Sequence, residues 1–325
     1  MLNGKCQMLV SKFAFLFPGQ GSQNVGMGKD LATHYPVAQQ TFDEADAALG
    51  YKLSQLCFEG PEEKLRLTEI TQPAILTVSV AAFRVLHEKC IMPALVAGHS
   101  LGEYSAHVAA GTLDFADAVR TVRNRGRYMQ EAVPVGEGAM AAILGMPGEE
   151  VQRICQEATA GDVCSAANLN SPEQTVISGS KAAVERTVEL AKSRGAKKTV
   201  MLAVSAPFHC ALMQPAQDRL AADLQKLTFR AMQFPLIKNI DAEPTTDPMD
   251  ARKALIHQVT GAVQWVNSMR KLISSGAEAF VEVGPGKVLC GLMRQIDRSK
   301  SCFNVEDEVS LQKTINALQQ FSVLK

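Results

Sequence analysis

A serine flanked by two glycines is the strongest sign of chemistry in this chain. Residues 98–102 read GHSLG and fit the pattern G-x-S-x-G, in which a strained turn lifts the serine hydroxyl out at the end of a sheet. A chain of this length shows the pattern by chance with a probability of roughly 0.1, and a simple turn serine also fits the spacing. An apolar strand expected at 94–97 and a helix expected from residue 103 supply the required context. The segment therefore predicts that Ser100 is a nucleophile.

A serine needs a base beside it to become nucleophilic at neutral pH, and the chain has six histidines. Four are poorly placed, either on polar-faced helices, beside the serine with the ring turned away, or on the serine's own helix: His34, His87, His99 and His107. His209 follows Pro207 in an extended or turning segment, which suits a cleft. His257 falls in an expected helix, where a core or surface histidine is the more ordinary occupant. We expect His209 to be the base, but the many carboxylates between Ser100 and His209 leave the acid of a triad unassigned.

An arginine shares the apolar row of the helix expected at residues 116–131. Ala118, Val122, Arg125 and Met129 follow one another at spacings of three and four, so they occupy one helix face. A buried guanidinium stays charged and must meet an anion. That anion is either an internal Asp or Glu, or a carboxylate on the substrate held by both arms of the guanidinium.

Motifs for several other chemistries are absent from the sequence. The glycines at 19 and 21 are followed by Asn24 where a dinucleotide-binding loop needs a third glycine, and neither a Walker sequence nor HExxH occurs. The eight cysteines form no CxxC pair and no Cys/His cluster. We therefore expect no metal site, and reduced, buried thiols typical of a cytosolic protein.

The elements around these residues follow the strand-turn-helix order of a parallel sheet. An apolar strand at 13–17 leads into a turn at 18–23, and strands at 94–97 and 279–283 each lead into a glycine turn and a helix. Thr71 is expected to cap a helix at 71–89 with Pro73 in its first turn. A last helix at 308–320 has the pattern of a packing element.

A second pattern occupies the middle of the chain. Residues 139–144, 162–168, 174–178 and 198–204 read as strands, and 147–159 and 182–194 read as helices. This β-α-β-β-α-β order is ferredoxin-like. We expect an α/β fold with a hydrolase-like, parallel-sheet large domain of residues 1–134 and 206–325, an inserted subdomain of residues 135–205, and a cleft between them.

The composition excludes several functional classes. The 325 residues carry 33 Lys plus Arg against 33 Asp plus Glu, which argues against a broad nucleic-acid-binding face, and 46% apolar content is too high for a disordered chain. No stretch approaches the eighteen or more apolar residues of a membrane span, and the short run 13–17 after Lys5 and Lys12 reads as a strand and not as a signal peptide. These values predict a globular, cytoplasmic protein.

Together the residues resemble the malonyl-CoA:acyl carrier protein transacylases of type II fatty acid synthesis. The matching segments span nearly the whole chain in the family's order: FPGQGSQ (17–23), TQP (71–73), GHSLGE (98–103), RG (125–126), MQEAVP (129–134), NLNSP (168–172), FH (208–209), Gln258 and VGPG (283–286). The resemblance implies a hydrolase-like α/β domain with a ferredoxin-like insert, as the elements above suggest.

The same resemblance implies roles for the reacting groups. Ser100 would be the nucleophile and His209 its general base, oriented by a backbone carbonyl at Gln258 in place of an acid. The backbone N–H groups of Gln20 and Leu101 would form the oxyanion hole.

It also implies how the acyl group is held. Arg125 would pair with the free carboxylate of a malonyl group, and Met129, Asn168 and Phe208 would line the pocket. The ring of Phe208 would crowd the space that an α-methyl group needs.

The implied reaction moves a malonyl group from malonyl-CoA through a serine ester to the phosphopantetheine thiol of acyl carrier protein, by a ping-pong mechanism. It needs no metal and no cofactor beyond the phosphopantetheine on the partner, and the family suggests a monomer. Three alternatives stay open: an esterase or thioesterase with water as acceptor, an inactive scaffold that binds carrier protein, and an acyltransferase of a polyketide pathway.

Overall fold

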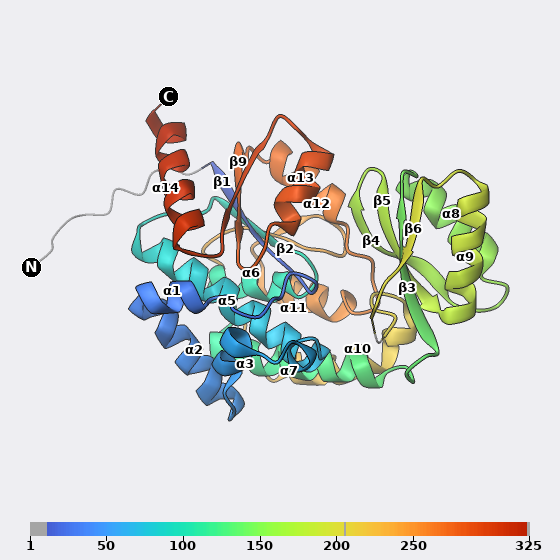
Figure 1. Cartoon of the computed structure of the whole chain (residues 1–325), viewed down its shortest axis with the longest axis horizontal. Helices are drawn as coiled ribbons and strands as arrows, with labels where there is room; N and C mark the ends of the chain where they lie inside the picture. The colour runs from blue at the N-terminus through green and yellow to red at the C-terminus, as the bar shows by residue number, and fades with distance from the viewer. Residues whose placement is uncertain (1–11, 205, 324–325) are drawn as a thin grey trace, which may run out of the picture.

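The computed structural model describes residues 12–204 and 206–323, and it shows a larger and a smaller lobe (Figure 1). Lys5 and Cys6 lie outside the described residues, as does residue 205 at the predicted end of the inserted subdomain. The larger lobe contains both ends of the described chain, and the smaller lobe is formed by the middle of the sequence.

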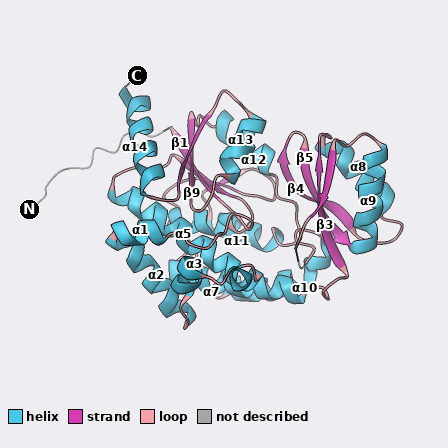
Figure 2. Cartoon of the chain, in the orientation of Figure 1, coloured by secondary structure: helices cyan, strands magenta, loops and turns pink. Residues whose placement is uncertain are grey.

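A six-stranded sheet forms the centre of the larger lobe (Figure 2). Its strands, in spatial order, are β10 (Ser301–Val305), β9 (Ala279–Val283), β1 (Phe13–Phe17), β2 (Leu95–Gly98), β7 (Leu236–Ile237) and β8 (Pro244–Thr245). The first five are parallel, and β8 pairs antiparallel with β7. The predicted parallel sheet is confirmed.

Helices cover both faces of this sheet, and β1 is therefore buried on both sides. Phe15 and Phe17 point to one face and pack against Phe83, whereas Ala14 and Leu16 belong to the core on the other face. The helices and the short 3₁₀ turn of the larger lobe are α1 (Lys29–His34), α2 (Pro36–Leu49), α3 (Leu53–Glu59), α4 (Glu62–Leu65), α5 (Thr68–Glu88), α6 (Gly102–Ala109), α7 (Phe115–Glu131), η1 (Ala211–Met213), α10 (Gln214–Gln225), α11 (Pro248–His257), α12 (Trp265–Ser274), α13 (Val288–Ile296) and α14 (Glu308–Val323).

The smaller lobe has the predicted β-α-β-β-α-β order. Its elements are β3 (Gly138–Leu144), α8 (Gly148–Ala158), β4 (Cys164–Ser171), β5 (Gln174–Ser180), α9 (Lys181–Ser193) and β6 (Lys198–Met201). The strands form an antiparallel sheet in the order β4-β5-β3-β6, with an apolar core of its own under α8 and α9. Backbone hydrogen bonds join it to the larger lobe, because Leu169 N–H donates to the carbonyl of Val263, whose own N–H donates to the carbonyl of Ala167.

Helix α5 differs from its prediction in two respects. It begins at Thr68, so Pro73 lies inside the helix, and Thr71 is no cap because its hydroxyl donates to the carbonyls of Leu65 and Leu67. Among the described residues it is also the one helix with the length and apolar content of a membrane span, and 83% of that window is buried within the fold. Polar side chains such as Gln72 and Ser79 interrupt this helix, so it contains no run of eighteen apolar residues. Its burial is that of a core helix.

Three of the described cysteines, Cys90, Cys290 and Cys302, are disulfide-bonded and not reduced as expected. Cys290 on α13 and Cys302 on β10 form a disulfide, because α13 packs against β10 and their Cα atoms lie 5.3 Å apart. Four others are free and buried, as predicted: Cys57, Cys155, Cys164 and Cys210. Within residues 12–204 and 206–323, no cluster of His, Cys, Asp and Glu could hold a metal ion.

Candidate active site

Three neighbouring parallel strands end at the same edge of the sheet and place the functional segments there. The turn after β1 carries Gln20, the turn after β2 carries Ser100, and the segment after β7 carries Asn239. Strand β7 is only two residues long, so the sequence pattern predicted neither this strand nor a role for Asn239 just beyond it.

The serine turn is tight and strained. Ser100 has a φ of 51°, in the left-handed region that residues other than glycine rarely adopt. A Cβ at Gly98 would lie 1.9 Å from the carbonyl oxygen of Gly102, and a Cβ at Gly102 would lie 2.0 Å from that of Phe17. Both glycines are therefore required by close backbone approach, as the G-x-S-x-G pattern implies.

The serine and His209 are in direct contact. Oγ of Ser100 lies 2.7 Å from Nε2 of His209, and Nδ1 of His209 lies 2.9 Å from the carbonyl oxygen of Gln258 and 3.1 Å from that of Gly261. Because those carbonyls only accept, Nδ1 carries the proton and Nε2 is free to accept from the serine. Burial, reinforced by the charge of Arg125, lowers the pKa of His209 to about 3, which keeps the ring neutral.

The histidines that the sequence disfavoured do not contact Ser100. Nε2 of His99 lies 2.8 Å from Oδ1 of Asn170, so its ring is engaged away from the serine, although it borders the cavity. His107 is fully buried on α6 and lies near Phe229. His257 is exposed at the end of α11.

Arg125 is buried beside the same serine, at 2% exposure, as the helix pattern predicted. Its guanidinium donates to Oε1 of Gln72 at 2.8 Å, to Oε1 of Gln258 at 2.9 Å and to Oγ of Ser100 at 3.1 Å. Burial lowers the pKa of Arg125, and Glu103 opposes that shift through space. Among the described carboxylates none is hydrogen-bonded to this guanidinium, so the internal Asp or Glu partner that the sequence left open is not found.

A cavity of about 130 Å³ lies over these groups. Eight of the residues predicted for the site line it: Gln20, Ser100, Leu101, Arg125, Met129, Asn168, Phe208 and His209. The ninth, Gln258, is fully buried behind them. Its backbone oxygen faces His209, while its Nε2 donates to the Ser100 carbonyl at 2.9 Å.

Two backbone N–H groups are available at this cavity. Those of Gln20 and Leu101 donate no hydrogen bond to any other described residue. Leu101 caps the N-terminus of α6, where the helix dipole favours negative charge. The arrangement is that of a nucleophile, a neutral base, a buried cation and unengaged N–H donors, which suits acyl transfer to or from a serine.

Comparison with known proteins agrees with this chemistry. The family model described as "Acyl transferase domain" matches residues 14–323. The chain belongs to the acyl transferase domain family.

Individual relatives of this acyltransferase are similar over most of its length. It is 52% identical over 288 residues to the malonyl CoA-acyl carrier protein transacylase of Escherichia coli K12, which covers 88% of this chain and 93% of that one. A crystal structure of an acyl carrier protein S-malonyltransferase from Vibrio cholerae superposes with a TM-score of 0.92 at 49% identity, covering 94% of this chain and 100% of that one. A malonyl-transacylase in complex with a type II PKS acyl-carrier protein matches with a TM-score of 0.92 at 48% identity, covering 95% and 100%. The resemblance found in the sequence is confirmed.

Sequence reasoning missed several residues at the site of the acyltransferase. Gln72 lay in a matching segment without a role, and its side chain holds Arg125. Met140 and Leu202 line the cavity from the smaller lobe. Their strand pattern indicated burial, but only the packing of the two lobes shows what they face.

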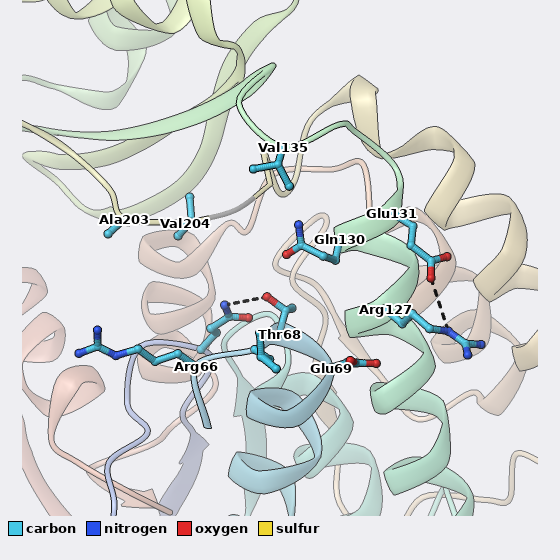
Figure 3. Close-up of a pocket in the computed structure, with 11 residues that line it drawn as sticks. Arg66, Thr68, Glu69, Arg127, Gln130, Glu131, Val135, Ala203 and Val204 are labelled. Atoms are coloured by element: carbon cyan, nitrogen blue, oxygen red, sulfur yellow. Dashed lines mark hydrogen bonds and ion pairs between the residues drawn. The ribbon is translucent and has the colours of Figure 1, made fainter. Parts of the chain in front are cut away.

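A second, larger cavity adjoins the first. It measures about 660 Å³, and Gln20 and Val204 line both cavities. Figure 3 shows Arg66 and Thr68 on one side, Gln130 and Arg127 on another, and Val135 and Ala203 towards the smaller lobe. The larger space therefore lies next to the cavity that Ser100 lines.

Proposed function

We propose that this chain is a malonyl-CoA:acyl carrier protein S-malonyltransferase of fatty acid biosynthesis. The observation that carries the proposal is the placement of Arg125, a buried cation within hydrogen-bond distance of the nucleophile and without a carboxylate among its hydrogen-bond partners. A buried guanidinium requires an anion. The free carboxylate of a malonyl group supplies that anion on the same acyl group whose thioester Ser100 attacks.

The first half-reaction makes a serine ester. Nε2 of His209 takes the hydroxyl proton as Oγ of Ser100 attacks the thioester carbonyl of malonyl-CoA. The N–H groups of Gln20 and Leu101 stabilise the negative charge on the tetrahedral intermediate. The C–S bond then breaks, and CoA leaves as a thiol with the proton held by His209.

The second half-reaction reverses these steps with another thiol. The phosphopantetheine thiol of acyl carrier protein gives its proton to His209 and attacks the ester, and Ser100 regains its hydroxyl as the C–O bond breaks. The carbonyl of Gln258 keeps the imidazole ring oriented throughout. The described side chains supply every group required, so we propose that the reaction uses no metal and no cofactor other than the phosphopantetheine of the carrier.

The cavity walls are proposed to select the acyl group. Met129, Asn168 and Phe208 enclose the space beside Arg125. Phe208 is buried, so its ring limits substitution at the α-carbon of the substrate.

The larger adjoining cavity is proposed to take the extended pantetheine arm. Its wall mixes apolar side chains, Leu67 and Val135, with the polar side chains of Thr68 and Gln130, which suits a chain of methylenes and amides. We also propose a monomeric, cytoplasmic enzyme, in keeping with the burial of the span-like helix α5 in the core.

Incubation with malonyl-CoA in the absence of carrier protein tests the mechanism. Mass spectrometry should find a malonyl adduct on the peptide that contains Ser100, and none in Ser100→Ala. Addition of carrier protein should transfer the malonyl group from Ser100 to the carrier. A thioesterase would instead lose the adduct to water, at the same rate with and without carrier protein. A missing adduct in the unmodified chain, or an adduct on another residue, would overturn the proposal.

A polyketide role is the second candidate, because one similar structure is a malonyl-transacylase bound to a type II PKS acyl-carrier protein. Discharge of the same adduct onto a fatty acid carrier and onto a polyketide carrier separates the two, since the site chemistry is identical. Preference for the fatty acid carrier supports the first assignment.

A further inference from the structure

Two buried polar residues that the mechanism does not use lie directly behind Ser100. Asn239 follows β7 and is 1% exposed, and Glu103 lies in the first turn of α6 and is fully buried. Neither residue lines the catalytic cavity. Polar groups buried this completely are costly unless their hydrogen bonds are made, so their contacts show what they hold.

The side chain of Asn239 makes two hydrogen bonds to the backbone of the serine turn. Its Oδ1 accepts from the N–H of Ser100 at 2.7 Å, and its Nδ2 donates to the carbonyl of Gly98 at 2.6 Å. Its own carbonyl accepts from the N–H of Gln264 at 2.8 Å, which attaches it to the start of α12. A residue such as Ser100, with a φ of 51°, persists in the left-handed region only when its surroundings over-determine it. The side-chain amide of Asn239 supplies two such constraints.

Glu103 joins the segment of Asn239 to the segment of Gln258. Its Oε2 accepts from the N–H of Asn239 at 3.1 Å and from Nε2 of Gln258 at 2.7 Å. With its Nε2 held by Glu103, Gln258 must present Oε1 to Arg125, whose Nη2 donates to that oxygen at 2.9 Å. The carboxylate thus fixes the direction of the amide that orients Arg125, on the same residue whose backbone carbonyl orients His209.

These contacts also decide which backbone donors face the cavity. The N–H of Ser100 is turned inward to Asn239, so it is unavailable to an oxyanion. The next N–H, that of Leu101, is left without a partner among the described residues. A small rotation of the turn would move both the serine hydroxyl and that donor away from the thioester.

We propose that Asn239 and Glu103 are positioning residues for acyl transfer, which hold the strained Ser100 turn and the Gln258 segment in fixed relation behind the reacting groups. The inference rests on the proposed function, because its effect is measured as formation of the malonyl-serine ester. Their hydrogen bonds connect, from behind, reacting groups that come from segments far apart in the sequence.

The test compares Asn239→Ala, Glu103→Ala and Glu103→Gln with the unmodified chain, by the rate of Ser100 malonylation over a range of malonyl-CoA concentrations. Asn239→Ala and Glu103→Ala should lower kcat about 10- to 100-fold while KM changes less than about threefold, since displacement of reacting atoms costs rate more than binding. Glu103→Gln should restore most of the rate, because its amide oxygen can accept both hydrogen bonds.

Glu282 provides the matched control. It is another fully buried glutamate, and it accepts from the N–H groups of Leu289 and Cys290 at the start of α13. It lies on β9, which β1 separates from the strand that leads into the serine turn. Glu282→Ala should lower the melting temperature and leave kcat of the folded enzyme unchanged. A purely structural role for Glu103 would make the two alanine variants behave alike.

Four outcomes are distinguishable. If the unmodified chain forms no adduct, the proposed function fails. If it forms the adduct, the positioning role is overturned when folded Asn239→Ala and Glu103→Ala keep kcat within about twofold of the unmodified chain, or when only their KM rises. An equal loss of kcat in Glu282→Ala overturns it too. If Asn239→Ala does not fold, Asn239→Ser and the Glu103→Gln comparison decide by the same criterion, with unchanged kcat in the serine variant counting against the proposal.

Discussion

Oγ of Ser100 lies 2.7 Å from Nε2 of His209 although the two residues are 109 positions apart in the chain. Both have positive φ, 51° and 59°, so each is held in a conformation that its own side chain disfavours. The pairing therefore depends on contacts from other elements: the close glycine turn around the serine, and the carbonyls of Gln258 and Gly261 around the histidine ring.

Removal of the base should abolish most of the acylation rate. We expect His209→Ala to slow malonylation of Ser100 by about 10²- to 10⁴-fold, because the other described side chain that is hydrogen-bonded to the serine hydroxyl, Arg125, only donates. His257→Ala, at the other histidine that the sequence left open, should stay within about twofold of the unmodified chain. Rapid-quench mass spectrometry measures both. A comparable loss in the two variants would contradict the assignment of the base.

Removal of Arg125 should change the substrate preference. Arg125→Ala is expected to lower malonyl transfer at least about 100-fold, because a charge-assisted, two-armed contact to the carboxylate is lost. Transfer of acetyl groups should be retained or should rise, since acetyl has no carboxylate and an uncompensated buried charge is gone. Arg120→Ala, on the exposed face of the same helix, is the control. Equal loss for malonyl and acetyl substrates would make Arg125 structural.

The ring of Phe208 should exclude branched substrates. In Phe208→Ala the ratio of kcat/KM for methylmalonyl-CoA to that for malonyl-CoA should rise at least about tenfold, because a single methyl group is worth that much in a fitted apolar pocket. Competition between the two thioesters for a purified carrier protein gives the ratio directly. An unchanged ratio would show that another wall of the catalytic cavity, and not Phe208, excludes the α-methyl group.

The glycine at the end of the serine turn should not tolerate a side chain. A Cβ at Gly102 would lie 2.0 Å from the carbonyl oxygen of Phe17, a backbone atom of the central strand that cannot yield cheaply. Gly102→Ala should lower the free energy of unfolding by about 2 to 3 kcal/mol or prevent folding. Gly291→Ala, inside α13 with no atom within 4 Å of the added Cβ, should raise it by about 0.5 to 1 kcal/mol. Denaturant unfolding of both variants provides the comparison, and a stable Gly102→Ala would contradict the close approach.

A buried histidine should make the fold sensitive to acid. Both ring nitrogens of His107 are buried without a hydrogen-bond partner among the described residues, and burial lowers its pKa from 6.5 to about 3. The folded state thus excludes the charged ring, so the stability from this group is present above pH 6.5 and lost as the pH falls towards 3. Between pH 7.5 and 5 the loss is about 2 kcal/mol.

The apolar variant His107→Leu isolates that contribution, since every other titrating group is shared with the unmodified chain. The difference in unfolding free energy between pH 7.5 and 5 should be smaller in the variant by about 2 kcal/mol. Identical pH dependence in the two chains would show that this histidine does not titrate on unfolding.

Much of the site could be predicted because its signals are local. Five consecutive residues predict the turn around Ser100, and the spacing of apolar residues on one helix face predicts the burial of Arg125. The ferredoxin-like order of the smaller lobe followed from alternating short elements, each recognisable alone. The start of α5 was misplaced because Thr71 and Pro73 imitate a helix beginning, while the true first turn at Thr68 carries no side-chain cap.

The tertiary structure decided what depends on contacts between distant segments. Strand β7 is two residues long, too short for a periodic signal, yet its pairing with β2 brings Asn239 under the serine turn. Likewise, no spacing connects Glu103 with Gln258, or Cys290 with Cys302. The sequence by itself determined which residues could react and which had to be buried, because those properties follow from local conformation and polarity. The packing of the strands and lobes determined which of them meet, because hydrogen bonds between remote segments form only once the chain has folded.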